Sequence, residues 1–171
     1  MFSRQELELI AEICIEHDLI AITDEVYEHL VFDGRHVPLA TMPGMRDRTV
    51  TISSGGKTFS CTGWKIGWIC APPDFVDAVK TVKQFLTYVN GAPFQPAIAT
   101  GLGLPDAVFT DAAAELRAKR DLLADGLTAA GFSVSMPDAG YFIVADARPL
   151  GYDDGAALCR RRSRAGGHPR R

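Results

Sequence analysis

Apolar residues in the first part of the chain recur at two spacings, the first typical of a helix and the second of a buried strand. Ser3 and Glu6 form a capping box, and the apolar residues that follow have helical spacing, so a helix is predicted over residues 4–17. Residues 19–23 are apolar on both faces, which is typical of a strand buried inside a parallel sheet. Asp24 follows directly and lies at the carboxyl end of that strand.

Two more strands and a second helix continue the pattern. Strands are predicted over residues 49–53 and 64–70, and the second of these ends before a pair of prolines. Asp74 can cap the following helix, which is expected to end near residue 90 and to turn its apolar side chains inward: Phe75, Val76, Val79, Val82 and Phe85. Helix and strand segments in this order predict an α/β layer structure.

The second part of the chain is predicted to be mainly helical, with a small hairpin. Pro93 and Pro96 open a short helix, and a long helix is predicted over residues 107–130. Its features are a buried stripe of Leu116, Leu123 and Leu127, an ion pair of Glu115 with Lys119, and a stop at Gly131. Residues 132–136 and 141–145 are predicted to form the two strands of a hairpin.

The last twelve residues differ in composition from the rest. Residues 160–171 hold six of the 18 lysines and arginines of the chain and lack apolar periodicity, so we expect a disordered basic tail. The abrupt change near residue 159 suggests a frameshift or a truncation, with a genuine basic tail as the alternative.

Composition and charge argue against several functions. The 171 residues correspond to one ordinary domain or to a piece of a longer protein. A formal charge of -3 does not suggest binding to nucleic acid or to a membrane. The four cysteines are widely scattered, which indicates free thiols in a reducing compartment rather than a zinc site. Since the N-terminus also lacks the apolar run of a signal peptide, we expect a cytoplasmic protein.

Lys57 and Asp24 are the first candidate functional residues because each follows a predicted buried strand. Ligands of open α/β sheets bind beyond the carboxyl ends of the strands. A cofactor such as pyridoxal phosphate needs an amine for its aldehyde, an acid near its ring nitrogen and donors around its phosphate. Lys57, Asp24, and the pair of Ser54 and Lys65 could supply these groups.

A nucleotide-binding P-loop is the main rival interpretation of the same lysine. Such a loop also ends in Gly-Lys-Ser/Thr, as residues 56–58 do. Its first glycine would fall at position 51, which is a threonine, and Gly63 interrupts the helix that should follow. A solvated loop lysine and a helix-capping aspartate are the simplest alternatives to any site.

Three short motifs resemble those of one protein family. They are Asp-Glu-Val-Tyr at residues 24–27, Ser-Gly-Gly-Lys-Thr-Phe at residues 54–59 and Gly-Trp-Lys-Ile-Gly at residues 63–67. They are similar to motifs of the class I/II aminotransferases, which use pyridoxal phosphate and have fold type I. Within that family, the chain most resembles the kynurenine and N-succinyldiaminopimelate aminotransferases.

The resemblance implies a role for each motif residue. Lys57 would bind the cofactor covalently and carry a proton between the substrate Cα and the cofactor C4′. Asp24 would pair with the pyridine nitrogen, and Tyr27 would contact the ring hydroxyl. Ser54 and Lys65 would hold the phosphate. The family more often has arginine in place of Lys65. The guanidinium of arginine can bind two phosphate oxygens at once, whereas the ammonium of lysine acts as a point charge.

The resemblance also implies a fragment of the fold-type-I transferase fold, because residues 1–159 match only the middle and part of the later half of the family's usual chain. Residues 1–105 would belong to the large cofactor-binding domain, with its mixed sheet, and residues 106–159 to a connecting helix and part of the small α+β domain. Family members are usually homodimers. The family's ring-stacking aromatic, ring-hydroxyl asparagine and substrate-binding arginine have no counterpart here, so we expect weak or no activity of the chain alone. A sheet that lacks the family's early strands has apolar edges without partners, which predicts instability or aggregation.

The implied function is transfer of an amino group from an amino acid to a 2-oxo acid. N-succinyldiaminopimelate, in lysine biosynthesis, is the first candidate substrate. One alternative is a C–S or β-lyase of the same fold, in which the same chemistry expels a β substituent. Another is a non-catalytic sensor domain of a transcription regulator, although no helix-turn-helix is evident in the sequence.

Overall fold

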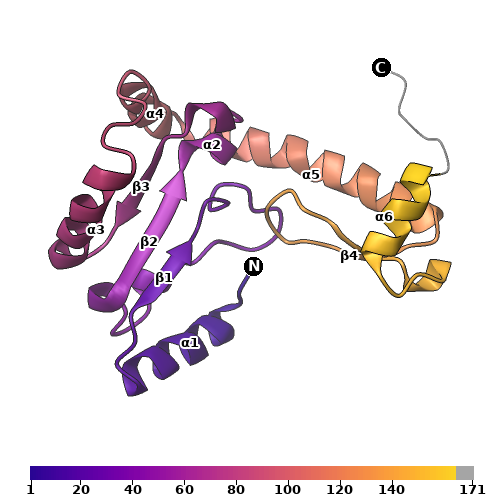
Figure 1. Cartoon of the computed structure of the whole chain (residues 1–171), viewed down its shortest axis with the longest axis horizontal. Coiled ribbons are helices and arrows are strands. Elements are labelled where there is room, and N and C mark those ends of the chain that lie inside the picture. The colour runs from indigo at the N-terminus through magenta and orange to yellow at the C-terminus, as the bar shows by residue number, and fades with distance from the viewer. Residues whose placement is uncertain (165–171) are drawn as a thin grey trace.

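The structure is a computed structural model that describes the backbone of residues 1–164 and the side chains of residues 1–160. A three-stranded sheet lies toward one end of the molecule, and the long helix α5 (Asp106–Ala129) runs from there toward a two-stranded hairpin (Figure 1). The mixture of helices and strands agrees with the predicted α/β class. No helix within residues 1–164 combines the length and hydropathy needed to cross a membrane.

Local sequence explains where helix α1 (Arg4–Glu16) begins. The Ser3 hydroxyl accepts a hydrogen bond from the Glu6 amide (3.3 Å), and the Glu6 carboxylate accepts one from the Ser3 amide (2.6 Å). The predicted capping box is therefore confirmed. The helix ends one residue before its predicted end, and His17 is its C-cap.

Strand β2 (Thr49–Ser54) is the central strand of the main sheet. It pairs in parallel with β1 (Ala21–Asp24) and antiparallel with β3 (Gly67–Cys70). All three predicted strands are present. The third is shorter than predicted because the 3₁₀ turn η3 (Thr62–Trp64) precedes it.

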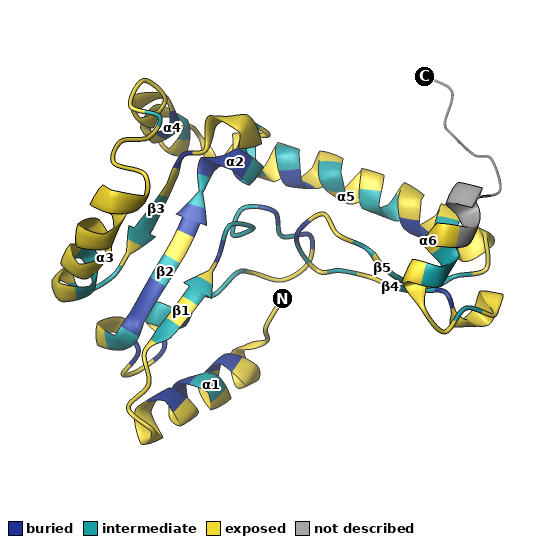
Figure 2. Cartoon of the chain, in the orientation of Figure 1, coloured by how far each residue is buried: buried dark blue, intermediate teal, exposed yellow. Residues whose placement is uncertain are grey.

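Strand β1 is an edge strand in the described part of the chain, so the prediction that it is buried inside the sheet is wrong. Its burial alternates along the strand, and Ile22 is 71% exposed. Figure 2 shows the contrast with β2, whose first residues are buried. An apolar run shows which side chains would gain from burial, but not whether a neighbouring element covers them.

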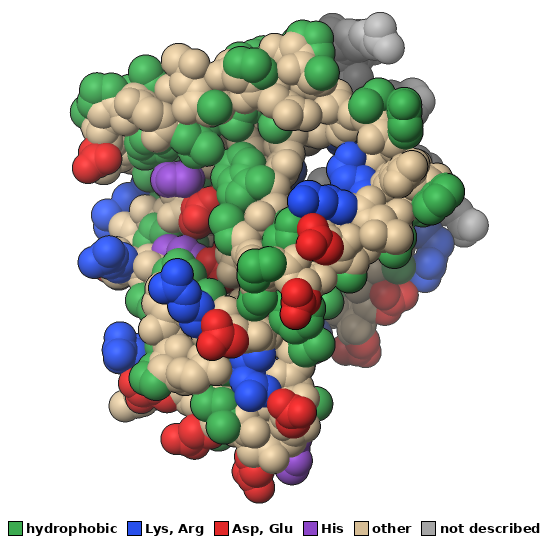
Figure 3. Space-filling model, turned by 90° about the vertical axis from the view of Figure 1, so that its left-hand side faces the viewer, with side chains coloured by type: hydrophobic (Ala, Val, Ile, Leu, Met, Phe, Trp, Pro, Cys, Tyr) green, Lys and Arg blue, Asp and Glu red, His purple; other side chains and the backbone are tan. Residues whose placement is uncertain are grey.

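Helix α3 (Pro73–Leu86) departs furthest from its prediction. Pro72 is its N-cap and Asp74 lies in its first turn, so the predicted Asp74 cap is wrong. Proline at the start of a helix has no amide that needs a partner, which explains a start without a side-chain cap. The predicted inward face is also wrong: no residue of α3 is buried, and Phe85 is 84% exposed. Figure 3 views the molecule from this side and shows apolar side chains on its surface.

The second half contains the predicted helices and hairpin, but α5 buries different residues. The short helix α4 (Gln95–Leu102) precedes α5, in which Glu115 and Lys119 form the expected ion pair (2.5 Å). The buried residues of α5 are Ala113 and Ala124, whereas Leu123 is exposed, so the predicted leucine stripe is wrong there. Strands β4 (Ser133–Ser135) and β5 (Val144–Asp146) form the antiparallel hairpin.

The segment predicted to be a disordered tail begins inside a helix. Helix α6 spans Gly155–Arg164, so the prediction is wrong for residues 160–164, while residues 165–171 lie outside the described residues. The Asp154 carboxylate accepts a hydrogen bond from the Ala156 amide (2.9 Å), which stabilises the helix start. Alanine, leucine and arginine also have high helix propensity. The domain boundaries at residues 105 and 159 stay predictions.

A buried apolar cluster joins α1 to the segment that precedes β2. This segment includes the 3₁₀ turns η1 (Leu39–Thr41) and η2 (Arg46–Arg48). The cluster consists of Leu7, Ala11, Cys14, Leu39, Met42 and Met45. The Met45 carbonyl accepts a hydrogen bond from the buried hydroxyl of Thr49 (2.7 Å), the first residue of β2. The cluster therefore fixes where the central strand begins.

The buried position of Met45 predicts its contribution to stability. Met45→Ala should lower the free energy of unfolding by about 2–5 kcal/mol, because truncation leaves a cavity in the cluster. Met136→Ala is the control, since Met136 is 52% exposed. It should change the free energy of unfolding by less than about 0.5 kcal/mol. Urea unfolding followed by circular dichroism measures both. Equal losses from the two substitutions would contradict the core position of Met45.

Candidate active site

The parallel pairing of β1 and β2 brings two predicted site segments to one edge of the sheet. Asp24 is the last residue of β1, and its Cα partner is Ile52, two residues before Ser54 at the end of β2. The Glu25 amide donates to the Ile52 carbonyl (2.8 Å), which continues the pairing past Asp24. Asp24 and the segment that carries Ser54 and Lys57 therefore leave the sheet at the same edge.

Lys57 lies in the short helix α2 (Gly55–Thr58), directly after β2. Its ammonium donates a hydrogen bond to the Tyr141 hydroxyl and lies 4.9 Å from the centroid of the Tyr141 ring. Tyr141 comes from the hairpin that carries β4 and β5, 84 residues further along the chain. Tyr141 could not be identified as a site residue from the sequence, because nothing in its apolar segment distinguishes a functional aromatic residue from a core one.

Tyr27 contacts Tyr141, and burial, together with the charge of Asp24, raises the pKa of its phenol. The two tyrosine rings meet edge to face, with their centroids 5.4 Å apart. Burial raises the pKa of Tyr27 to about 12, together with the hydrogen bond to Tyr141 and the charges of Tyr141 and Asp24. The Tyr27 phenol therefore stays protonated at neutral pH and can donate a hydrogen bond. Contacts thus link Lys57 to Tyr141 and Tyr141 to Tyr27, while the charge of Asp24 acts on the pKa of Tyr27.

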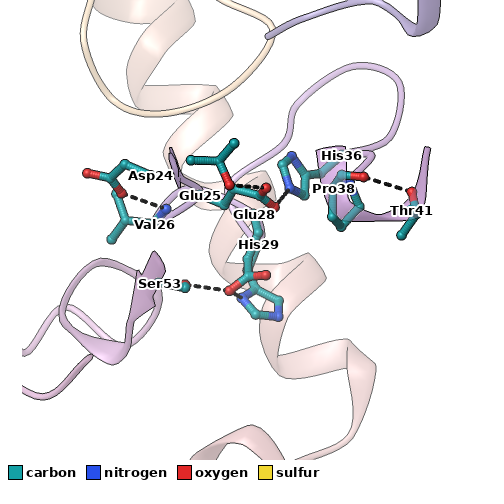
Figure 4. A network of polar contacts seen from close by, with 10 residues as sticks. Asp24, Glu25, Val26, Glu28, His29, His36, Pro38, Thr41 and Ser53 are labelled. Atoms are coloured by element: carbon teal, nitrogen blue, oxygen red, sulfur yellow. Dashed lines mark hydrogen bonds and ion pairs between the residues drawn. The ribbon is translucent and has the colours of Figure 1, made fainter. Parts of the chain in front are cut away.

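The side chain of Glu25 holds the loop that follows Asp24. The Glu25 carboxylate is buried, accepts a hydrogen bond from the Thr23 hydroxyl (2.8 Å) and lies 2.7 Å from His36 Nε2 (Figure 4). Burial raises the pKa of Glu25, but the hydrogen bonds from His36 and Thr23 and the charge of His36 outweigh burial and leave this pKa below its ordinary value. An ionised Glu25 therefore anchors the loop behind Asp24.

Ser54 and Lys65 lie at the neighbouring ends of β2 and β3. Ser54 pairs with Gly67, and Lys65 precedes Gly67 by two residues. A Cβ at position 67 would lie 2.9 Å from the Ser53 carbonyl oxygen, so glycine permits this close approach of the two strands. The Lys65 carbonyl accepts a hydrogen bond from the Asn90 side chain (2.9 Å).

The predicted site residues line two cavities rather than one. Asp24 and Tyr27 line a cavity of about 620 Å³ beside α1, whereas Lys57 and Tyr141 line a cavity of about 410 Å³ beside α5. Ser54 and Lys65 line neither of the two. The contact between Tyr27 and Tyr141 connects the two sets of residues.

The donor set at this edge fits pyridoxal phosphate. Lys57 supplies a primary amine, Asp24 a carboxylate and Tyr27 a neutral phenol. Tyr141 contacts both Lys57 and Tyr27, and Asp24 leaves the sheet at the same edge as the Lys57 segment. Ser54 and Lys65 add a hydroxyl and a cation at the adjoining strand ends. These are the groups that the aldehyde, ring nitrogen, ring hydroxyl and phosphate of that cofactor require.

The contact between Lys57 and Tyr141 predicts how one tyrosine titrates. The hydrogen bond from Lys57 lowers the pKa of Tyr141, the bond from Tyr27 acts in the same direction, and burial opposes them. Lys57→Ala should therefore shift the titration of one tyrosine to higher pH, as measured by ultraviolet absorbance. Lys80→Ala, which removes an exposed ammonium of α3, should leave the curve unchanged. A Lys57→Ala curve identical to that of the parent chain would contradict the contact.

Comparisons with known proteins agree on one family. The family model for aminotransferase class I and II matches residues 1–161. A probable N-succinyldiaminopimelate aminotransferase of Mycobacterium tuberculosis is 54% identical over 160 residues, which are 93% of this chain and 40% of that protein. Kynurenine–oxoglutarate transaminase 3 of Homo sapiens is 42% identical over 161 residues, or 90% of this chain and 36% of that protein.

Solved structures of such enzymes share the fold. The N-succinyldiaminopimelate aminotransferase from Mycobacterium tuberculosis matches with a TM-score of 0.89 and 55% identity over 92% of this chain and 41% of that one. A Thermus thermophilus aspartate aminotransferase mutant complexed with tryptophan matches with a TM-score of 0.88 and 30% identity over 97% of this chain and 44% of that one. The chain thus spans about two fifths of the length of these relatives. It has part of the fold-type-I architecture and belongs to the class I and II aminotransferases, a family that depends on pyridoxal phosphate.

Proposed function

We propose that the chain is the lysine-bearing part of an aminotransferase that moves an amino group from an amino acid to a 2-oxo acid. The observation that supports this most is the common sheet edge shared by Lys57 and Asp24, with Tyr27 and Tyr141 in contact between them. An amine and a carboxylate in this relation can address opposite ends of one pyridine ring.

Each side chain has a distinct part in the proposed reaction. Pyridoxal phosphate, when bound, supplies an electron sink for the negative charge left when the substrate Cα loses its proton. Lys57 Nζ would hold the cofactor's aldehyde carbon, and after the substrate amine takes its place it would remove the proton from Cα. The Asp24 carboxylate would keep the pyridine nitrogen protonated. The Tyr27 phenol, with its raised pKa, would donate a hydrogen bond to the ring oxygen.

Ser54 and Lys65 would hold the phosphate in this proposal. Their support is the pairing of Ser54 with Gly67, two residues after Lys65. A lysine ammonium attracts phosphate as a point charge and lacks the fork by which arginine binds two oxygens at once. We therefore expect phosphate to be held less rigidly here than by an arginine at the same position.

The substrate, compartment and assembly are further parts of the proposal. N-succinyldiaminopimelate is the first candidate substrate, supported by the name of the relative at 54% identity, and kynurenine is the second. The free thiols of Cys14, Cys61 and Cys70 are in keeping with the cytoplasm. The exposed apolar side chains of α3 support assembly with further polypeptide, including a second copy in a homodimer.

Trapping the cofactor on its lysine tests the proposed function. The chain is incubated with pyridoxal phosphate, reduced with borohydride, digested and analysed by mass spectrometry. We expect a pyridoxyl group on Lys57 and none after Lys57→Ala, because the Lys57 amine directly follows β2 and contacts Tyr141 beside Tyr27. Lys80→Ala, from an exposed ion pair of α3, is the matched control and should keep the adduct. An adduct that survives Lys57→Ala unchanged would overturn the proposal.

A further inference from the structure

Two side-chain contacts connect the loop after β1 with the segment that carries Lys57. The Glu28 carboxylate accepts a hydrogen bond from the Ser53 hydroxyl (2.5 Å), as Figure 4 shows. His29 Nδ1 lies 3.3 Å from the Thr58 hydroxyl, within hydrogen-bonding distance. We call these two contacts the brace.

The brace holds the Lys57 segment at both of its ends. Ser53 directly precedes Ser54, and Thr58 directly follows Lys57, so the two contacts enclose residues 54–57. Both hydroxyl-bearing residues are buried, with Ser53 3% and Thr58 8% exposed. A hydrogen bond is stronger where water is excluded, and breaking it there leaves an unsatisfied polar group.

On the other side, the brace attaches directly to the predicted cofactor residues of the β1 loop. Glu28 and His29 follow Tyr27 in the chain, and the Glu28 amide donates to the Glu25 carbonyl (2.9 Å) within the same turn. Glu25, one residue after Asp24, is anchored by His36. In the chain, Tyr27 therefore lies between two carboxylates that are held by hydrogen bonds. Glu25 is bonded to Thr23 of β1, and Glu28 is bonded to Ser53 of β2.

Helix α5 supports the brace from a third direction. The His29 ring stacks on Phe109 of α5, with centroids 4.7 Å apart and planes inclined by 27°. The same phenylalanine contacts Phe59, which follows Thr58 (5.9 Å between centroids). Phe109 therefore supports one face of the imidazole beside Thr58.

We infer that Glu28 and His29 are positioning residues, which fix Asp24 and Tyr27 relative to Ser54 and Lys57. The inference rests on the proposed function, because it assigns these four residues to one cofactor. Neither brace residue is expected to touch the cofactor. Loops already held in the binding geometry lose less conformational freedom on binding, so the brace should increase cofactor affinity.

Three variants of the 171-residue chain test the inference. Glu28→Ala breaks the contact with Ser53, whereas Glu28→Gln keeps an oxygen that can accept the Ser53 hydrogen bond. Glu8→Ala, which removes an exposed carboxylate paired with Arg4 on α1, is the control for loss of a glutamate. Dissociation constants for pyridoxal phosphate are measured by fluorescence titration. Hydrogen exchange of the cofactor-free chains is measured by mass spectrometry.

We expect Glu28→Ala to raise the dissociation constant of the cofactor about tenfold. A change of this size corresponds to the loss of one hydrogen bond to a charged group. Glu28→Gln should recover most of the affinity, and Glu8→Ala should bind as the parent chain does. In the cofactor-free protein, Glu28→Ala should speed exchange over residues 24–30 and 53–59 together. Exchange in the buried cluster around Met45 should stay unchanged, which separates loss of positioning from general unfolding.

Unchanged affinity in Glu28→Ala, or an equal loss in Glu28→Gln, would overturn the inference. Exchange that speeds in only one of the two segments would also overturn it. Failure of the proposed function has a different signature, because the parent chain itself would then form no adduct on Lys57. The exchange measurement would still decide whether the brace holds the two segments together.

Discussion

The parallel hydrogen-bonded pair of β1 and β2 is the constraint on which the candidate site depends. Parallel strands present their carboxyl ends at the same edge, so Asp24 and Lys57 emerge together although Lys57 follows Asp24 by 33 positions in the chain. An antiparallel pair would send the two residues to opposite edges. The register between Asp24 and Ile52 also decides how far each segment extends past the sheet.

Different parts of the fold keep this pair in place. At its start, β2 is tied to the apolar cluster through the hydrogen bond between Thr49 and Met45. At its end, β2 pairs closely with β3, where Gly67 allows the approach to Ser53. The buried, ionised Glu25 holds the loop after β1. The site thus combines a rigid strand edge with loops whose position depends on a few polar contacts.

Features encoded over a few neighbouring residues could be predicted from sequence. The Ser3 and Glu6 capping box is such a feature, because both partners lie within one helical turn. The three strands and the hairpin likewise follow from alternating or continuous apolar runs. The three motifs at residues 24–27, 54–59 and 63–67 identified the family, and the family comparison agrees.

Features that depend on distant contacts could not be predicted in the same way. Periodicity marked Phe85 and Ile22 as candidates for burial, yet both are exposed, since burial needs a neighbour that the pattern does not identify. Tyr141 reaches Lys57 only through the packing of the hairpin. The pairing of Glu28 with Ser53 likewise arises from tertiary structure and leaves no local signal.

A crystal structure of the 171-residue chain with pyridoxal phosphate tests the central claim most directly. We predict continuous density from Lys57 Nζ to the cofactor and an Asp24 carboxylate oxygen about 2.7–3.2 Å from the pyridine nitrogen. A cofactor attached to Lys57 whose ring nitrogen faces another residue, or a cofactor bound away from the edge shared by β1 and β2, would contradict the account.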